Sequence, residues 1–396
     1  MLYIQRSINI LLIFFLSCAC PVGAGVALQQ DVSEARQLVE AARTAEAKEA
    51  WPTAEVSYLK AIELAPQWAE LWVNLGVVYN RMGKMDDAIR SFSQAARLWP
   101  NLVAAHLNLG ITYFKATRYE LATAPLERAI AIDPGNLQAR QLLSLSLIAL
   151  EKFAEAVEQL EKLYSEQHGG APILRALGQC YLRLKLYDKA VARLSELVRL
   201  EPNSGQAHLW LGEALDNTSQ PEAAIFEFRR AIKLDPQLLE AHYALGLTLL
   251  KKGDLDEAAQ HFSEELKLNP HMALALYQLG KINLTRGQLD TAISMLTGVI
   301  EAVPDFRPGL EALGQALLKK KDAPRAVEVL ERAVKLDPNW PDGHVLLGRA
   351  YMAAGQRQEA MEQFEIAQRL SSAERKRLEE KVNETKSSNG AARKPG

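Results

Sequence analysis

Nine consecutive segments of equal length, the first beginning at Ala35 and the second at Ala69, and a slightly shorter tenth segment repeat one pattern of apolar and polar positions. When each segment is numbered from 1, positions 4, 7, 8 and 11 are mostly apolar or small. At 100° per residue, these positions fall within about 100° of arc on a helix. The pattern therefore predicts a first helix with one buried stripe, and the small residue at position 8 predicts close approach of a neighbouring helix.

A turn and a second helix are predicted to complete each segment. Glycine at position 15 can supply the turn, and proline at positions 17–18 suits the first turn of a helix. The residues concerned are Gly83, Gly253, Gly287 and Gly355 for the turn, and Pro52, Pro221 and Pro324 for the helix start. Pairs such as Asp133-Pro134 end the second helix, because the residue before a proline avoids the α region. Each segment is thus expected to be a helical hairpin.

Proline recurs near the end of the segments at one strict interval, which equals the length of a segment. The positions are Pro66, Pro100, Pro134, Pro202, Pro236, Pro270, Pro304 and Pro338, and His168 takes the place of the missing member. Such a regular period indicates a repeat array rather than separate globular domains. One hairpin has no second layer against which to bury its apolar stripe, so neighbouring hairpins are expected to stack.

Particular residue types also recur at fixed places within the period. The second segment carries Trp72, Leu75-Gly76, Tyr79, Ala88, Phe92, Ala95 and Pro100, and Leu-Gly recurs at 109–110, 177–178, 211–212, 245–246, 279–280, 313–314 and 347–348. This spacing resembles the tetratricopeptide repeat family, whose pattern is W-x2-L-G-x2-Y, then A-x3-F, then P, in a unit of about 34 residues. The first segment departs from the pattern with Ala41-Ala42, and the fourth with Leu143-Ser144 and no proline.

The resemblance implies an all-α fold, a right-handed superhelical α-solenoid of tandem helix-turn-helix repeats. The expected repeats are 35–68, 69–102, 103–136, 137–170, 171–204, 205–238, 239–272, 273–306, 307–340 and 341–372. Leu378 and Val382 lie one turn apart in the charged stretch that follows, so residues 373–386 are expected to form a C-terminal cap helix. Residues 387–396 are expected to be a disordered tail.

The N-terminus has the pattern of an export signal. Arg6 precedes an apolar run over 8–16, and small residues follow as far as residue 27. A basic start, a short apolar core and small residues at a cleavage site are typical of secretory signals, and the core is about half of the roughly 20 residues that a spanning helix needs. Residues 1–27 are therefore predicted to be a signal peptide, with an uncleaved anchor as the alternative, and 28–34 a linker. Cys18 and Cys20 are candidates for lipidation, although Phe15-Leu16-Ser17 departs from the usual lipoprotein pattern.

Composition and charge leave little room for other functions. Apolar residues make up 48% of the chain, enough for a large core, and the net charge of −2 gives no overall attraction to nucleic acid. No phosphate-binding loop and no Cys/His pair with metal spacing is present in the sequence. Histidine stands at position 4 in four segments (His106, His208, His242 and His344), where it is expected to be a half-buried packing residue rather than a metal ligand. No catalytic residue, metal site or cofactor is predicted.

In the family that the sequence resembles, the first helices line a groove that holds partners. Positions 2, 5, 6, 9, 12 and 13 lie on the side of the first helix away from the predicted core stripe. The candidate groove residues are Val73, Asn74, Val77, Leu107, Asn108, Ile111, Phe114, Arg175, Tyr243, Leu247 and Tyr277. Apolar residues on such a surface indicate a contact site, and the alternative is that several are half-buried against the adjacent first helix.

Three functions are compatible with these features. The first is an exported, non-enzymatic scaffold, periplasmic or secreted, that holds a peptide or helix of a protein partner in the groove. The second is a lipid- or membrane-anchored accessory factor in envelope or pilus assembly, with membrane association through the N-terminus only. The third is a regulatory arm of an enzyme complex.

Overall fold

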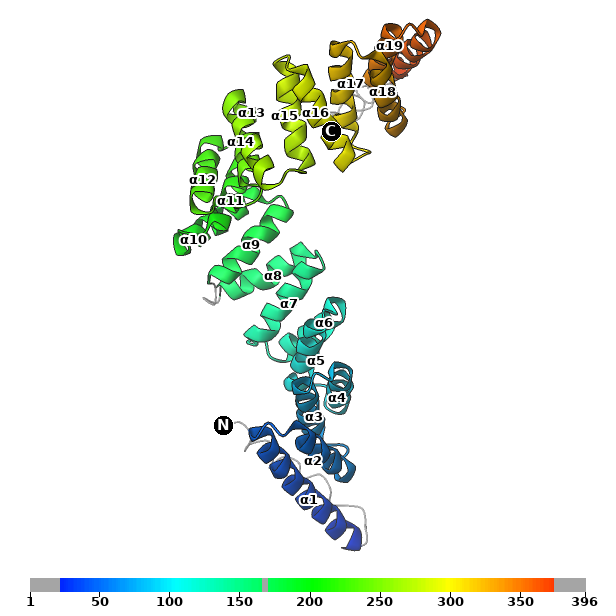
Figure 1. Ribbon diagram of the computed structural model, residues 1–396. Helices are drawn as coiled ribbons and strands as arrows, with labels where there is room; N and C mark the ends of the chain where they lie inside the picture. Colours follow the sequence, from blue (N-terminus) through cyan, green and yellow to red (C-terminus); the bar gives the residue numbers. More distant parts are fainter. Residues whose placement is uncertain (1–21, 166–169, 374–396) are drawn as a thin grey trace, which may run out of the picture. The chain divides into compact units, whose positions relative to one another are not determined.

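The computed structural model of the chain describes residues 22–165 and 170–373, and every regular element in these ranges is helical (Figure 1). Contacts divide the chain into two compact units, with the boundary between Leu186 and Tyr187. The residues of the predicted export signal before Val22, including Cys18 and Cys20, lie outside the described part. So do residues 374–396, which hold most of the expected cap helix and the expected tail.

The first unit consists of helices that pair in chain order. They are α1 (Val22–Ala47) with α2 (Trp51–Leu64), α3 (Ala69–Arg81) with α4 (Met85–Leu98), α5 (Val103–Lys115) with α6 (Tyr119–Ile132), α7 (Leu137–Ala149) with α8 (Phe153–Leu163), and then α9 (Ala171–Arg183). Each second helix also packs on the first helix of the following pair, as α4 does on α5 and α6 on α7.

The second unit continues the same order. It holds α10 (Tyr187–Leu200), α11 (Gly205–Asn217) with α12 (Pro221–Leu234), α13 (Ala241–Lys252) with α14 (Leu255–Leu268), α15 (Ala273–Thr285) with α16 (Leu289–Ala302), α17 (Arg307–Lys320) with α18 (Ala323–Leu336), and α19 (Pro341–Ala353). A further helix covers 357–373. The predicted all-α class and the series of stacked helical hairpins are confirmed.

The start of the array differs from the expected linker. Residues 28–34 belong to α1, which runs without a break from Val22. The stretch from Leu28 to Glu34 contains neither proline nor glycine, so nothing in it interrupts a helix. Among the described residues, no helix combines the length and the apolar composition that a membrane crossing requires.

Position 15 is left-handed in every repeat. The four glycines predicted to supply the turn, Gly83, Gly253, Gly287 and Gly355, have φ values of 75°, 93°, 75° and 81°. The six other repeats place a non-glycine residue there with φ between 56° and 65°: Glu49, Thr117, Glu151, Lys185, Ser219 and Lys321. The turn geometry is therefore fixed by the hairpin, and residues that tolerate it less well than glycine still adopt it.

Glycine at position 8 allows the two helices of a hairpin to touch, as predicted. A Cβ on Gly212 would lie 2.6 Å from the ring of Phe228, and one on Gly110 would lie 2.5 Å from Leu126. The same pairing of positions 8 and 24 recurs at Gly76, Gly246, Gly280, Gly314 and Gly348. Ser144 occupies this position in the fourth repeat, where it is fully buried and its hydroxyl donates to the carbonyl of Arg140 (2.8 Å).

The buried surface of the first helices is wider than the predicted stripe. Positions 3 and 10 are buried as well, with Ala105 and Thr112 in α5 and Ala241 and Thr248 in α13 as examples. These positions face the preceding hairpin, because each first helix packs on the second helix before it as well as on its own partner. The predicted apolar stripe accounted for packing on one neighbouring helix only.

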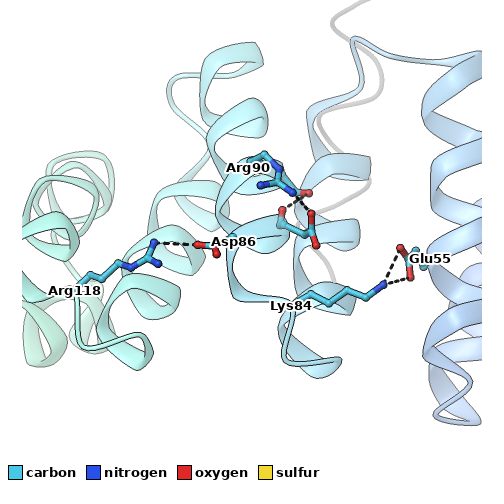
Figure 2. Close-up of polar contacts among 7 residues, drawn as sticks. Glu55, Lys84, Asp86, Arg90 and Arg118 are labelled. Carbon is cyan, nitrogen blue, oxygen red and sulfur yellow. Dashed lines mark hydrogen bonds and ion pairs between the residues drawn. The ribbon is translucent and has the colours of Figure 1, made fainter.

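Ion pairs also link consecutive repeats. In the first unit, Lys84 in the turn between α3 and α4 pairs with Glu55 of α2 (2.9 Å). Arg118 in the turn between α5 and α6 likewise pairs with Asp86 of α4 (3.0 Å) (Figure 2). Similar pairs come from the turn or from the end of the first helix in later repeats: Lys152–Glu120, Lys252–Glu222, Arg286–Asp256 and Lys320–Asp290. Most of these side chains are exposed, so each pair contributes at most about 1 kcal/mol. These surface pairs therefore join neighbouring hairpins but add little to their stability.

Candidate partner-binding face

The predicted site residues lie on first helices in both units. In the first unit they are Val73, Asn74 and Val77 on α3, Leu107, Asn108, Ile111 and Phe114 on α5, and Arg175 on α9; in the second they are Tyr243 and Leu247 on α13 and Tyr277 on α15. Arg175 is exposed and most of the others are half-buried. Val73 is only 8% exposed and packs in a core cluster with Phe92. Val73 therefore serves packing in this structure.

Polar side chains join neighbouring first helices. The Asn80 amide of α3 donates to the hydroxyl of Thr112 in α5 (2.8 Å), and that hydroxyl donates to the carbonyl of Asn108 (2.7 Å). In the second unit, Thr248 of α13 donates to the Asp216 carboxylate of α11 (3.1 Å). Both contacts join position 12 of one repeat to position 10 of the next. This contact holds adjacent first helices in register and was not evident from the sequence.

The face of the first unit is mainly apolar. Leu107 and Ile111 are half-buried on α5, and Leu145 of α7 is 47% exposed. Phe114 packs edge-on against Tyr119, with ring centroids 5.4 Å apart. The Asn108 amide donates to the carbonyl of Ala104 in its own helix (2.8 Å), so one of its donors is already engaged.

The face of the second unit carries two tyrosines at equivalent positions of consecutive repeats. The ring of Tyr243 lies 5.7 Å from that of Phe262, and the ring of Tyr277 lies 5.2 Å from that of Phe306, edge-on. Lys281 lies over the Tyr277 ring at 5.3 Å. Burial raises the pKa of the Tyr243 hydroxyl, and a hydrogen bond from the Gln278 side chain acts in the opposite direction. Both rings are thus fixed by aromatic contacts while remaining only half-buried.

In five repeats, the side chain at position 4 contacts the backbone of the proline-containing turn that precedes its helix. Nitrogen atoms of these side chains lie within hydrogen-bond distance of the carbonyl of the proline six residues earlier. The pairs are Trp72 with Pro66 (3.1 Å), His106 with Pro100 (3.0 Å), Arg140 with Pro134 (2.7 Å), His208 with Pro202 (3.1 Å) and His344 with Pro338 (3.0 Å). Their shared property is a nitrogen donor rather than apolar character. The expectation that the position 4 histidines only pack was therefore incomplete, although the six-residue spacing from proline was visible in the sequence.

Position 4 also contacts position 23 of the second helix. His208 Nδ1 lies 2.5 Å from the Glu227 carboxylate, His344 Nδ1 lies 2.7 Å from the Gln363 amide oxygen, and Arg140 donates to Gln159 (3.2 Å). The seventh repeat instead brings together His242 and His261, with their Nδ1 atoms 2.9 Å apart. Among the described residues, no group of three or more His, Cys, Asp or Glu side chains is arranged to hold a metal ion.

Cys180 is the only cysteine within the described ranges and lies at position 10 of α9. Its side chain is 1% exposed, and burial raises the pKa of its thiol to about 11. It is therefore a packing residue in this helix.

The chain matches family models along most of the repeat array. Models described as tetratricopeptide repeat match residues 69–134, 147–210, 243–307 and 317–370, and a model described as TPR repeat matches 220–253. Together they cover more than half of the chain. The chain belongs to the tetratricopeptide repeat family, whose arrays are scaffolds for binding other proteins.

Three of the solved structures that are similar to this chain differ in sequence identity, coverage and TM-score. A crystal structure of MamA is 23% identical and covers 42% of this chain and 97% of its own, with a TM-score of 0.40. The Naa15/Naa10 complex bound to HypK-THB is 15% identical over 85% of this chain and 63% of its own, with a TM-score of 0.47. The C-terminal part of a TPR repeat-containing protein from Cytophaga hutchinsonii is 18% identical over 57% of this chain and 93% of its own, with a TM-score of 0.48. A comparison with curated proteins found no match.

Proposed function

We propose that this protein is an exported, non-enzymatic scaffold that binds an extended or helical segment of a partner protein along the exposed side of its first helices. The observation that carries this proposal is the pair Tyr243 and Tyr277 on α13 and α15. Each presents a half-buried ring with a polar tip, held by a phenylalanine behind it. Rigid rings that lose little entropy on binding, and that combine apolar area with a hydrogen-bonding group, are favoured at protein interfaces.

The first unit supports the same proposal with a different surface. Leu107, Ile111 and Leu145 place apolar side chains on α5 and α7 that their own hairpins cover only in part. Apolar groups exposed close together lose contact with water when a partner covers them. The first unit therefore offers a partner an aliphatic surface, and the second unit offers tyrosines.

The test uses the full chain with an affinity tag, expressed in its own cell, and compares variants of one unit. The double variant Tyr243→Ala, Tyr277→Ala removes both rings from the proposed face. Phe226→Ala is the matched control, because Phe226 is a large aromatic residue of α12 that is 67% exposed. We expect the double variant to retain at most about one tenth of the co-purified partner, which corresponds to a loss of about 1.4 kcal/mol or more, while the control retains it. Equal recovery by both variants would contradict the proposal.

Export is proposed from the sequence of residues 1–27, with the basic residue Arg6, the apolar core and the small residues after it. Mass spectrometry of the mature N-terminus tests it, since removal of the predicted signal yields a chain that starts near residue 28. A mature chain that retains Met1 would contradict a cleaved signal.

The second candidate, a lipid-anchored accessory factor of envelope or pilus assembly, depends on Cys18 and Cys20. It predicts that the protein fractionates with membranes and that Cys18→Ser with Cys20→Ser releases it. Membrane retention by this double variant would reject lipidation.

A further inference from the structure

The seventh repeat differs from the others where its two helices meet. Positions 4 and 23 form donor–acceptor pairs in the fourth, sixth and tenth repeats, through Arg140–Gln159, His208–Glu227 and His344–Gln363. The seventh repeat places a titratable imidazole on both sides, His242 on α13 and His261 on α14, with ring centroids 5.1 Å apart. Of these four contacts between positions 4 and 23, the His242–His261 contact is the one in which both side chains can take up a proton and become cations.

The chemistry of two facing Nδ1 atoms allows only one proton between them. One ring must donate and the other must accept across the 2.9 Å contact. The arrangement is satisfied when His242 donates to His261, because His261 Nε2–H then faces the Glu257 carboxylate at 3.7 Å. One further proton can be carried by the pair without breaking the contact. A second additional proton places two N–H groups and two positive charges against each other.

The surroundings of the pair favour the neutral form. Burial lowers the pKa of both imidazoles from the ordinary value of 6.5, and His242 lowers that of His261 further. The charged groups that face the pair are Glu257, Glu264, Glu265 and Lys267 from α14, and Arg229 from α12. The carboxylates act against the shift and the two cations act with it, and burial is the largest effect.

The start of α13 is also built differently in this repeat. Glu265 stands at position 27, where Ala231 and Ala333 stand in the sixth and ninth repeats, and its side chain is fully buried. Its carboxylate accepts hydrogen bonds from the backbone N–H of Glu240 (2.9 Å) and of Tyr243 (3.2 Å). Glu240 has a left-handed backbone, with φ of 71°. Tyr243 is therefore joined to α14 both through its own N–H and through its neighbour His242.

We propose that the His242–His261 contact makes the seventh repeat an acid-sensitive joint, in which protonation of both rings separates the start of α13 from α14 and releases Tyr243 from its fixed position. Lowered pKa values mean that the folded repeat binds fewer protons than the unfolded chain below about pH 6.5. The stability that the neutral pair contributes is fully present above about pH 6.5, and it is lost as the pH falls through the lower pKa values that the two imidazoles have in the folded state. The inference goes beyond partner binding and holds whether or not Tyr243 contacts a partner.

Hydrogen–deuterium exchange of the full chain at about pH 7.5 and about pH 5, corrected for intrinsic rates, tests the proposal. We expect the amides of 241–249 to lose protection on acidification at least about threefold more than those of 207–215 and 343–350. The excess loss of protection should be about tenfold for each pH unit by which folding lowers the pKa of an imidazole. Equal losses in the three repeats would overturn the proposal.

Two reciprocal variants separate the histidine pair from other causes. His261→Gln gives the seventh repeat the acceptor found at Gln363, so its excess loss of protection should disappear. Gln363→His places the facing imidazoles in the tenth repeat, opposite His344, and should make 343–350 acid-sensitive. Persistence of the excess loss in His261→Gln would overturn the proposal, because the acid response would then not depend on the second imidazole.

Discussion

Gly76 of α3 lies directly against the ring of Phe92 in α4, so that a Cβ on Gly76 would stand 2.6 Å from the nearest ring carbon. No real Cβ approaches a ring so closely, and Phe92 is fully buried and cannot turn aside. The contact sets the distance between the two helices of the second hairpin. Its equivalents in other repeats explain why glycine at position 8 recurs together with a large residue at position 24.

Gly76→Ala should therefore destabilise the first unit by about 1–3 kcal/mol, the usual cost of overpacking a core. Urea unfolding of the full chain, followed by circular dichroism, measures it as a lower midpoint. Gly135→Ala is the control, since the nearest atom to a Cβ there is an exposed Asp133 oxygen at 3.5 Å. An unchanged midpoint for Gly76→Ala would contradict the close contact.

Thr117→Gly should stabilise the chain, because a β-branched residue occupies a left-handed turn at φ of 56°. The gain should be about 1 kcal/mol, reduced by the greater freedom that glycine has in the unfolded chain. Gly83→Ala is the reciprocal variant in the preceding repeat, where nothing lies within 4 Å of the added Cβ and only the backbone conformation opposes it. The melting temperature should rise for the first variant and fall for the second, and shifts of the same sign would be inconsistent with the shared turn.

The secondary structure of the array was predictable from the sequence because each signal is local. Spacing fixed the hairpins, and glycine at positions 8 and 15 marked the close contact and the turn. The burial of positions 3 and 10 was missed, since a helical stripe does not show that a helix has two packing partners. The hydrogen bonds from position 4 were missed for another reason: Trp72, His106 and Arg140 share a nitrogen donor, not a hydrophobicity, and their carbonyl acceptors belong to the backbone.

The sequence predicted which side of the first helices carries the candidate site, but not which of the residues on that side are buried. Helical geometry placed Tyr243 and Tyr277 at equivalent positions, but the burial of Val73 depends on Phe92, which lies on another helix. The His242–His261 contact likewise depends on two residues that only the hairpin brings together. Such pairs become visible once the repeat register shows that positions 4 and 23 touch.

His208→Leu should destabilise the second unit, although leucine occupies the same position at Leu174, Leu276 and Leu310. His208 is 5% exposed and contacts both the Pro202 carbonyl and the Glu227 carboxylate. Removing the imidazole leaves both groups without this partner, at a cost of about 1–3 kcal/mol. Urea unfolding measures it. The comparison variant is His106→Leu, whose bond to Pro100 is exposed and whose midpoint should fall less; an equal or larger fall there would contradict the argument.

Tyr351 should ionise far above an ordinary tyrosine. Burial and, next, the hydrogen bond from its hydroxyl to the Glu331 carboxylate raise its pKa to about 12, from 10.0. Because the folded state holds the proton more tightly, this contribution to stability is complete below pH 10.0 and is lost as the pH rises through about 12. Ultraviolet titration of tyrosinate, with Tyr351→Phe to assign the step, measures it. Glu331→Gln should move the step to lower pH, and an unmoved step would contradict the role of the carboxylate.

Cys180 should be unreactive in the folded protein. Its thiolate is disfavoured by burial, which raises the pKa to about 11, and its side chain is inaccessible to reagents. Alkylation by iodoacetamide should become rapid only when urea unfolds the first unit. Rapid modification of the native chain would show that α9 opens more readily than its packing implies.

The central claim, that a partner binds along the exposed side of the first helices, is tested most directly by photo-crosslinking in the cell. Benzoylphenylalanine would replace Ile111 or Tyr277 on first helices, and Leu121 or Phe226, which are 52% and 67% exposed on second helices, as controls. The account predicts one specific adduct with a protein partner from the first-helix positions and none from the controls. An adduct from the second-helix positions alone would contradict it.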